Sequence, residues 1–281
     1  MTSLQKIIKY AAIAFAIYLS IMIISMIVFG ITLIFGISTG IDMYEESKQE
    51  KQEMISNDFI DITELENLDI DLKECKLEIK KGESLKVEYD KVNTDFECVL
   101  NGKTLKIKDN RVNINWFNFS KVQSNMIIYI PETTQLSKVD INLGAADTNI
   151  EYLKCEKLNI NTGAGRCHIQ DLIAQDAKVE CGAGETSIDE TTLDTLKLDG
   201  GVGKTSITGS INQSANINAG VGRLEINLIG SSEDYKIKAE TGLGQFVVDN
   251  KRVTDNQIIG TGNVDIDIDA GVGETIVSFI E

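Results

Sequence analysis

A short tripeptide, glycine followed by a small apolar residue and a second glycine, recurs along the second half of the chain. Copies begin at Gly163, Gly182, Gly201, Gly220, Gly242 and Gly271, and a degenerate copy, GAA, begins at Gly144. Counted from Gly144, the intervals are 19, 19, 19, 19, 22 and 29 residues. A fixed short period is typical of repeat proteins in which each unit packs only on its neighbours. The chain is therefore expected to form a stack of similar coils.

The residues on either side of each tripeptide alternate between apolar and polar. In LKLDGGVGKTSI, Leu196 and Leu198 precede Gly201 by five and three residues, and Ile207 follows it by six. The other copies carry apolar residues at the same places, and the residue between the two glycines is apolar as well. Period-two alternation predicts strands with one buried face. The expected fold class is all-β, a single-domain parallel β-solenoid of about 19-residue coils, preceded by one N-terminal transmembrane helix.

Before each first glycine the buried positions lie an odd number of residues away, and after it they lie an even number away. Each corner must therefore contain one residue more than a regular strand would. Glycine permits this, because it takes positive φ freely and lets two backbones approach closely. The predicted structural glycine corners are Gly144, Gly163, Gly165, Gly182, Gly184, Gly201, Gly203, Gly220, Gly222, Gly242, Gly244, Gly271 and Gly273.

The stretch GGVGKTS also resembles the deviant phosphate-binding loops of chromosome-partitioning ATPases. A phosphate loop needs GxxxxGK[ST] and a helix behind it. Here Leu198 stands at the first glycine position, Asp199 replaces the signature lysine, and a strand-like pattern follows. We therefore expect no nucleotide binding at Lys204 and Thr205. Lys204 instead belongs to an outward charge ladder, three residues after each first glycine: Asp147, Arg166, Glu185, Lys204 and Arg223.

A second outward column, two residues before each first glycine, admits two interpretations. It comprises Asn142, Asn161, Glu180, Asp199, Asn218, Glu240 and Asp269. The column offers oxygen ligands for Ca²⁺, but its period differs from that of calcium-binding nonapeptide repeats. Ladders of side-chain hydrogen bonds between stacked coils are the favoured interpretation, and no metal or cofactor is expected.

No pattern in the chain predicts catalysis. His168 is the single histidine, is expected to point outward, and has no nucleophile or cleft implied beside it. The cysteines are odd in number and fit no metal spacing, so they are expected to be small buried apolar residues: Cys75, Cys98, Cys155, Cys167 and Cys181. We expect a protein that is not an enzyme.

The N-terminal region predicts a membrane anchor. No charged residue occurs from Tyr10 to Ile41, which exceeds the ~20 residues that span a bilayer and the roughly 7 to 15 of a signal peptide. We expect a short tail over residues 1–9, a transmembrane helix over 10–37 and a polar stalk over 38–58. A form cleaved near Ser38 and Gly40 is the alternative.

Charge sets the expected orientation and excludes one class of partner. Lys6 and Lys9 adjoin the apolar segment more closely than Lys48 and Lys51 do, which favours a cytoplasmic N-terminus and an extracytoplasmic domain in the cell membrane. The remaining 25 lysines and arginines face 43 acidic residues, all at or beyond Asp42, so the rest of the chain carries a charge of −18. Such a surface repels phosphate backbones, and nucleic acid is not an expected partner.

A β-strand repeat domain is expected over residues 59–281, with regular repeats over 139–281. Before the repeats, LEIKKGESLKVEY, FECVLNGKTLKIKD and NMIIYIPET predict strands broken at Lys81-Gly82 and at the hairpin signal Asn101-Gly102. These segments, followed by LSKVDINLGAADTNIEYL and KLNINTGAGRCHIQDL, resemble bacterial putative-adhesin β-strand-repeat domains, also called toastrack-type domains, over roughly residues 60–281. The resemblance implies a stacked all-β domain of unknown function on a membrane-anchored envelope protein, and it brings no catalytic residues.

Two functions follow as hypotheses. The first is a non-catalytic envelope protein whose domain is an adhesin-like surface for an envelope protein or a surface polymer. The second, implied by the family's links with envelope-stress signalling, is a regulatory or sensory partner that acts through the membrane segment. Trp116, Phe117 and Phe119 form either an interaction patch or a plug for the first coil. Val277 and Phe279 lie on a final strand expected to be an unpaired edge, open to self-association.

Overall fold

The computed structural model describes residues 55–58, 65–90, 92, 96–109, 124–253 and 257–280. The regular structure of these residues is all β, with thirteen strands in one sheet. None of them forms a helix long and apolar enough to span a membrane. The expected tail, membrane helix and most of the stalk lie outside the described residues, as do Trp116, Phe117 and Phe119.

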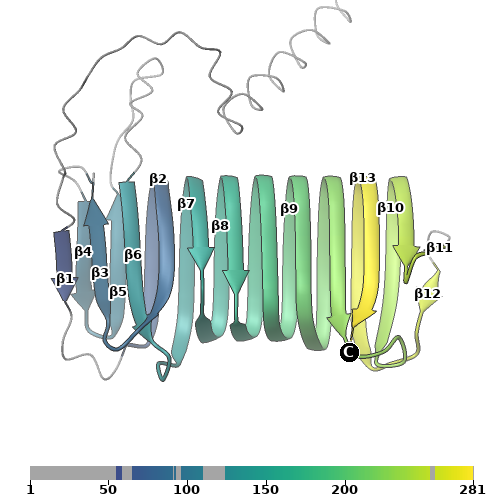
Figure 1. The fold of residues 1–281 in the computed structure, drawn as a ribbon, viewed down its shortest axis with the longest axis horizontal. Helices are drawn as coiled ribbons and strands as arrows, with labels where there is room; N and C mark the ends of the chain where they lie inside the picture. The colour runs from purple at the N-terminus through teal and green to yellow at the C-terminus, as the bar shows by residue number, and fades with distance from the viewer. Residues whose placement is uncertain are drawn as a thin grey trace, which may run out of the picture. The chain divides into compact units, whose positions relative to one another are not determined.

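The central coils stack in parallel and in register. They comprise β2 (Asn67–Gly82), β7 (Leu136–Ile150), β8 (Leu153–Gln170) and β9 (Leu172–Ile229). Val139 pairs with Leu158, and Leu158 with Ala177, so from β7 onward each of these coils lies 19 residues after its neighbour. β9 is continuous through three glycine corners, and its coils lie side by side with those of β7 and β8 (Figure 1).

The segments before the repeats cover the first coil. β5 (Thr104–Asp109) and β6 (Ser124–Pro131) pair in parallel with the two halves of β2. Antiparallel strands lie outside them: β4 (Phe96–Asn101) on β5, and β3 (Lys86–Asp90) followed by β1 (Ile55–Asp58) on β6. β4 and β5 form the hairpin that Asn101-Gly102 predicts, with Gly102 at a φ of 59°.

At the far end the spatial order departs from the chain order. β13 (Val264–Ile280) lies between β9 and β10 (Tyr235–Val248), parallel to both (Figure 1). Two short strands, β11 (Lys251–Val253) and β12 (Ile258–Ile259), pair antiparallel with the other edge of β10. Because they occupy that edge, β13 fits only on the side facing β9.

The prediction that the final strand is an unpaired edge is therefore wrong. β13 is paired on both sides, and Val277 is fully buried. Phe279 is partly buried against the core, and its ring stacks on Tyr235 with centroids 6.0 Å apart. The β10 side of β13 is paired only as far as Val277, and self-association through this end stays a prediction.

The shared interior is built from the columns that the alternation predicts. Ile141, Ile160, Val179 and Leu198 succeed one another at the same place in their coils and are almost completely buried. Burying one such side chain contributes about 1.5–3 kcal/mol, so the columns together supply most of the apolar stabilisation. After each corner the even inward phase is observed. Four residues past the first glycine, Thr148, Thr186, Thr205 and Thr275 are buried.

Candidate interaction surface at the glycine corners

The corner glycines lie above one another, and each leaves no room for a side chain. A Cβ atom on a first glycine, such as Gly201, would lie 2.0–2.6 Å from a carbonyl oxygen of the adjacent coil. On second glycines it would lie 1.7–2.0 Å from such an oxygen. Five second glycines also take a φ between 127° and 143°: Gly165, Gly184, Gly203, Gly222 and Gly273. The first glycine thus permits close approach, and the second also turns the chain.

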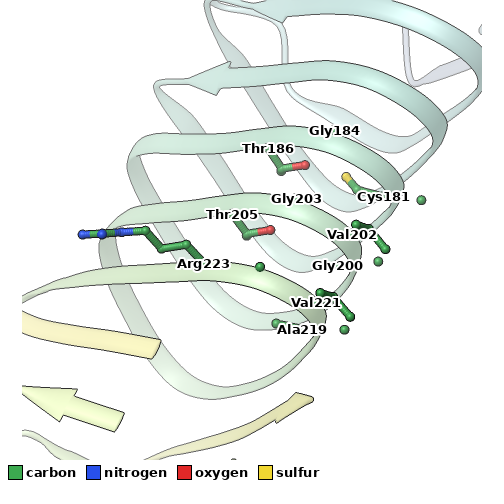
Figure 2. A pocket seen from close by; sticks show the side chains of 14 residues that line it. Cys181, Gly184, Thr186, Gly200, Val202, Gly203, Thr205, Ala219, Val221 and Arg223 are labelled. Carbon is green, nitrogen blue, oxygen red and sulfur yellow. The ribbon is translucent and has the colours of Figure 1, made fainter. Parts of the chain in front are cut away.

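The residue between the two glycines points away from the interior. Val202, Val221 and Val272 are 57%, 48% and 44% exposed, and Leu243 is 77% exposed. Figure 2 shows Val202 and Val221 directed outward on successive coils, while Thr186 and Thr205 point inward. These side chains form the corner ridge, which runs in spatial order through Ala145, Ala164, Ala183, Val202, Val221, Val272 and Leu243.

The corner ridge grows in size from one end to the other. Three alanines are followed by three valines and a leucine, but only because β13 places Val272 before Leu243. Of the eight large hydrophobic side chains exposed among the described residues, four lie on this ridge. Apolar exposure concentrated along one line marks an interaction site more often than scattered exposure does.

A groove follows the corner ridge along the first glycines. Its volume is about 610 Å³, and its lining includes Gly182, Gly201 and Gly220. One side is formed by the polar column, represented by Asn161, Glu180, Asp199, Asn218 and Asp269. Because the glycines have no side chains, the peptide backbone forms the floor. The groove therefore offers backbone groups, amides and carboxylates next to an apolar ridge.

The polar groups beside the groove pair with one another between coils. Asn218 donates its side-chain amide to Asp199 at 2.6 Å, and Asn159 donates to Asp140 at 2.7 Å in a parallel column. Glu180 instead pairs within its own strand, with Lys178 at 2.6 Å. The described residues contain no group of three histidine, cysteine, aspartate or glutamate side chains placed to hold a metal ion. These contacts agree with the ladder interpretation of the column.

The charge ladder on the other side is formed in part. Arg166 pairs with Asp147 at 2.6 Å. Lys204 pairs with Glu225 at 3.7 Å, two positions further along the next coil. Arg223, the second of two adjacent cations in the sequence ladder, meets Glu274 of β13 at 3.0 Å. The insertion of β13 thus supplies the acidic partner that the chain order lacked.

The phosphate-loop hypothesis does not fit this geometry. Strand continues through Gly203 and beyond, and the Thr205 side chain is 8% exposed, pointing into the coil. The pocket at this corner has a volume of about 20 Å³ and is lined by Cys181, Thr186, Gly200 and Thr205, among others (Figure 2). Such a volume holds about one water molecule, far less than a nucleotide.

His168 has neighbours that the sequence did not indicate. The register places Ser187 beside it on the next coil, and Asp189 lies 3.7 Å from its Nδ1 atom. Ser187 donates its hydroxyl group to Asp189 rather than to the imidazole. A histidine that activates a serine must accept the serine proton, so this geometry is not that of a nucleophilic triad.

No disulfide bond joins cysteines among the described residues, and three of the five are buried. Desolvation raises the pKa of Cys155 to about 12 and also raises the pKa of Cys167. A thiol that remains protonated is a poor nucleophile. Cys75, Cys155 and Cys167 are the small buried residues expected, whereas Cys98 and Cys181 are partly exposed.

The sequence matches the family described as Toastrack DUF4097 over residues 65–269, which is most of the chain. The chain belongs to this family. The toastrack match spans the first coil, the stacked coils and the beginning of β13, so the resemblance seen in the repeats is confirmed. Comparison with curated proteins gave no match.

Several solved structures are similar to this toastrack chain. A putative cell adhesion protein from Clostridium sporogenes ATCC 15579 is 16% identical, with a TM-score of 0.39 over 82% of this chain and 100% of that one. A putative adhesin from Bacteroides fragilis NCTC 9343 is 16% identical, with a TM-score of 0.41 over 81% and 97%. A putative lipid binding protein from Parabacteroides distasonis ATCC 8503 is 14% identical, with a TM-score of 0.36 over 83% and 98%. Family membership rests on the sequence match alone.

Proposed function

We propose that this protein is a non-catalytic, membrane-anchored envelope protein whose toastrack domain is an adhesin-like binding surface. The observation that carries the proposal is the corner ridge, with Val202, Val221, Val272 and Leu243 exposed in one line. Each faces solvent at a cost that a bound partner would relieve. Residues 10–37 are proposed to hold the domain at the cell membrane, with the N-terminus cytoplasmic and the domain extracytoplasmic.

The chemistry of the surface favours an extended partner. The corner ridge and its groove run across successive coils rather than forming one closed pocket. Strands in neighbouring coils lie about 4.8 Å apart, so a linear chain with repeating apolar and polar groups meets an apolar ridge residue and a polar column residue at every step. A surface polymer or an extended segment of an envelope protein has this form.

Replacing ridge side chains tests the proposal. Cells that display the full chain are compared for adhesion to surfaces coated with purified cell-wall sacculi and with mucin. The triple variant Val202→Ser, Val221→Ser, Leu243→Ser is expected to weaken adhesion at least about tenfold, equivalent to about 1.4 kcal/mol. The loss is expected because each serine removes apolar area from the contact.

A matched control removes exposed apolar groups elsewhere. Val99, Ile173 and Ile258 are 40%, 39% and 56% exposed and lie off the ridge. Their triple serine variant is expected to keep adhesion. Equal adhesion by both variants would contradict the ridge assignment. Residues 10–37 can also be replaced with an unrelated membrane helix. If this change abolishes envelope-stress signalling while adhesion is unchanged, the regulatory hypothesis is favoured.

A further inference from the structure

We infer that β13 is an exchangeable strand, and that the slot between β9 and β10 binds β13 of a second copy of this chain. The chain leaves β9, builds β10 with its two short covering strands, and only then returns to fill the space it left. β13 is therefore inserted between segments that both precede it in the sequence.

The slot is matched to β13 on both faces. On the β9 side, the Cβ position of Gly273 lies 1.7 Å from the Gly222 carbonyl oxygen, so only glycine fits. On the β10 side, the Cβ position of Gly244 lies 2.0 Å from the Gly273 oxygen. Ile266, Ile268 and Val277 complete the buried columns. Without β13, two strand edges of the described coils would lack a partner.

Charged groups fix the same alignment from both sides. Glu274 meets Arg223 of β9 at 3.0 Å, and Asp265 meets Lys236 of β10 at 2.9 Å. Asp249, which follows β10, donates its backbone N–H to the Val277 carbonyl oxygen and accepts a hydrogen bond from the Phe279 N–H. None of these contacts depends on which copy of the chain supplies β13.

The connection that leads into β13 is a tight crossing. Residues 260–263 pass against the segment that joins β9 to β10, where the Gly262 N–H donates to the Tyr235 carbonyl oxygen at 3.1 Å. A Cβ atom on Gly262 would lie 2.0 Å from the Asp234 carbonyl group, and Gly260 takes a φ of 78°. Short, crowded hinges favour exchange, because an opened hinge keeps all other contacts and releases the crowding.

The test uses full-length protein in detergent. Chains labelled with ¹⁴N and ¹⁵N are unfolded together, refolded at high concentration and separated by size. A carbodiimide then joins lysine and carboxylate groups that are in contact. When equal amounts of the two labels are mixed, half of the Lys236–Asp265 cross-links in the dimer are expected to combine one ¹⁴N and one ¹⁵N peptide, because random pairing also forms dimers of a single label. Lys157–Asp176 cross-links, between coils that follow in chain order at 3.6 Å, are expected to stay within one isotope.

Two variants with the same chemical change sharpen the test. Gly262→Ala is expected to raise the dimer fraction, whereas Gly102→Ala, at a hairpin where the added Cβ meets no atom within 4 Å, is expected to leave it unchanged. In the monomer both cross-links form within one chain, which shows that the reaction reaches them. Absence of dimer, Lys236–Asp265 cross-links in the dimer that are all of a single isotope, or mixed isotopes at both pairs would each overturn the inference.

Discussion

The stretch GGVG contains three glycines with different physical roles. Gly203 combines a φ of 143° with a Cβ position 1.8 Å from the Gly184 carbonyl oxygen. Gly201 lacks the positive φ, but its Cβ position lies 2.0 Å from the Gly182 carbonyl oxygen. Gly200 borders the small pocket at this corner, and its Cβ position is 3.1 Å from the rotatable Thr205 hydroxyl group. Identical residues in one stretch thus tolerate a methyl group very differently.

Alanine substitution at these two extremes is the residue-scale prediction. Gly203→Ala is expected to lower the free energy of unfolding by more than about 2 kcal/mol, since strain and a backbone clash add. Gly200→Ala is expected to change it by less than about 1 kcal/mol, because the hydroxyl group can rotate and the chain loses unfolded-state entropy. Urea denaturation of both variants measures the difference. Equal destabilisation would contradict the assignment of roles.

At the scale of elements, strand order decides which charges meet. Gln245 of β10 is registered with Glu274 of β13, and Glu274 lies between Gln245 and Arg223. Had the coils stacked in chain order, position 245 would lie between Arg223 and Glu274 and meet one charge of each sign. Substitutions at this position therefore report the order of the strands.

The expected result is opposite in sign for opposite charges. Gln245→Lys is expected to raise the free energy of unfolding by a few tenths of a kcal/mol and Gln245→Glu to lower it by a similar amount. The difference should shrink at high salt, because exposed pairs are screened. Denaturation at low and high ionic strength measures it. Variants of equal stability at low salt would favour stacking in chain order.

At the scale of the whole molecule, β13 joins the end coil to the rest of the stack. In a repeat protein each coil is stabilised by its neighbours, and β10 lies between β13 and two strands of three and two residues. The stability of the end coil therefore depends on β13. The central coils have long partners on both sides and do not share this dependence.

Weakening β13 should release β10 selectively. Val277→Ala removes fully buried methyl groups and is expected to cost about 2 kcal/mol. Amide hydrogen exchange is expected to accelerate in β13 and β10 while β7 and β8 keep their protection, because local opening follows cooperative units. Ile141→Val, in a central coil, is the control and should leave β10 unaffected. Uniform acceleration along the chain would contradict this dependence.

The sequence by itself determined the coil. Glycines at a period of 19, with apolar residues in phase around them, predict stacked strands, their buried columns and the corners, because these depend on steric rules within one repeat. It also identified Val202 and Val221 as apolar, but not that they face solvent, since the residue between two turning glycines has no phase to follow.

Tertiary structure alone decided which coils are neighbours. β9 has compatible glycines and apolar columns for either β10 or β13, so local pattern does not discriminate between them. The choice depends on two sets of contacts. The short strands β11 and β12, which follow β10 closely in the chain, cover its other edge, and Glu274 pairs with Arg223, which lies 51 residues away in the sequence. The graded corner ridge and the placement of Ser187 beside His168 are likewise products of stacking, because side chains on different coils meet only after the coils assemble.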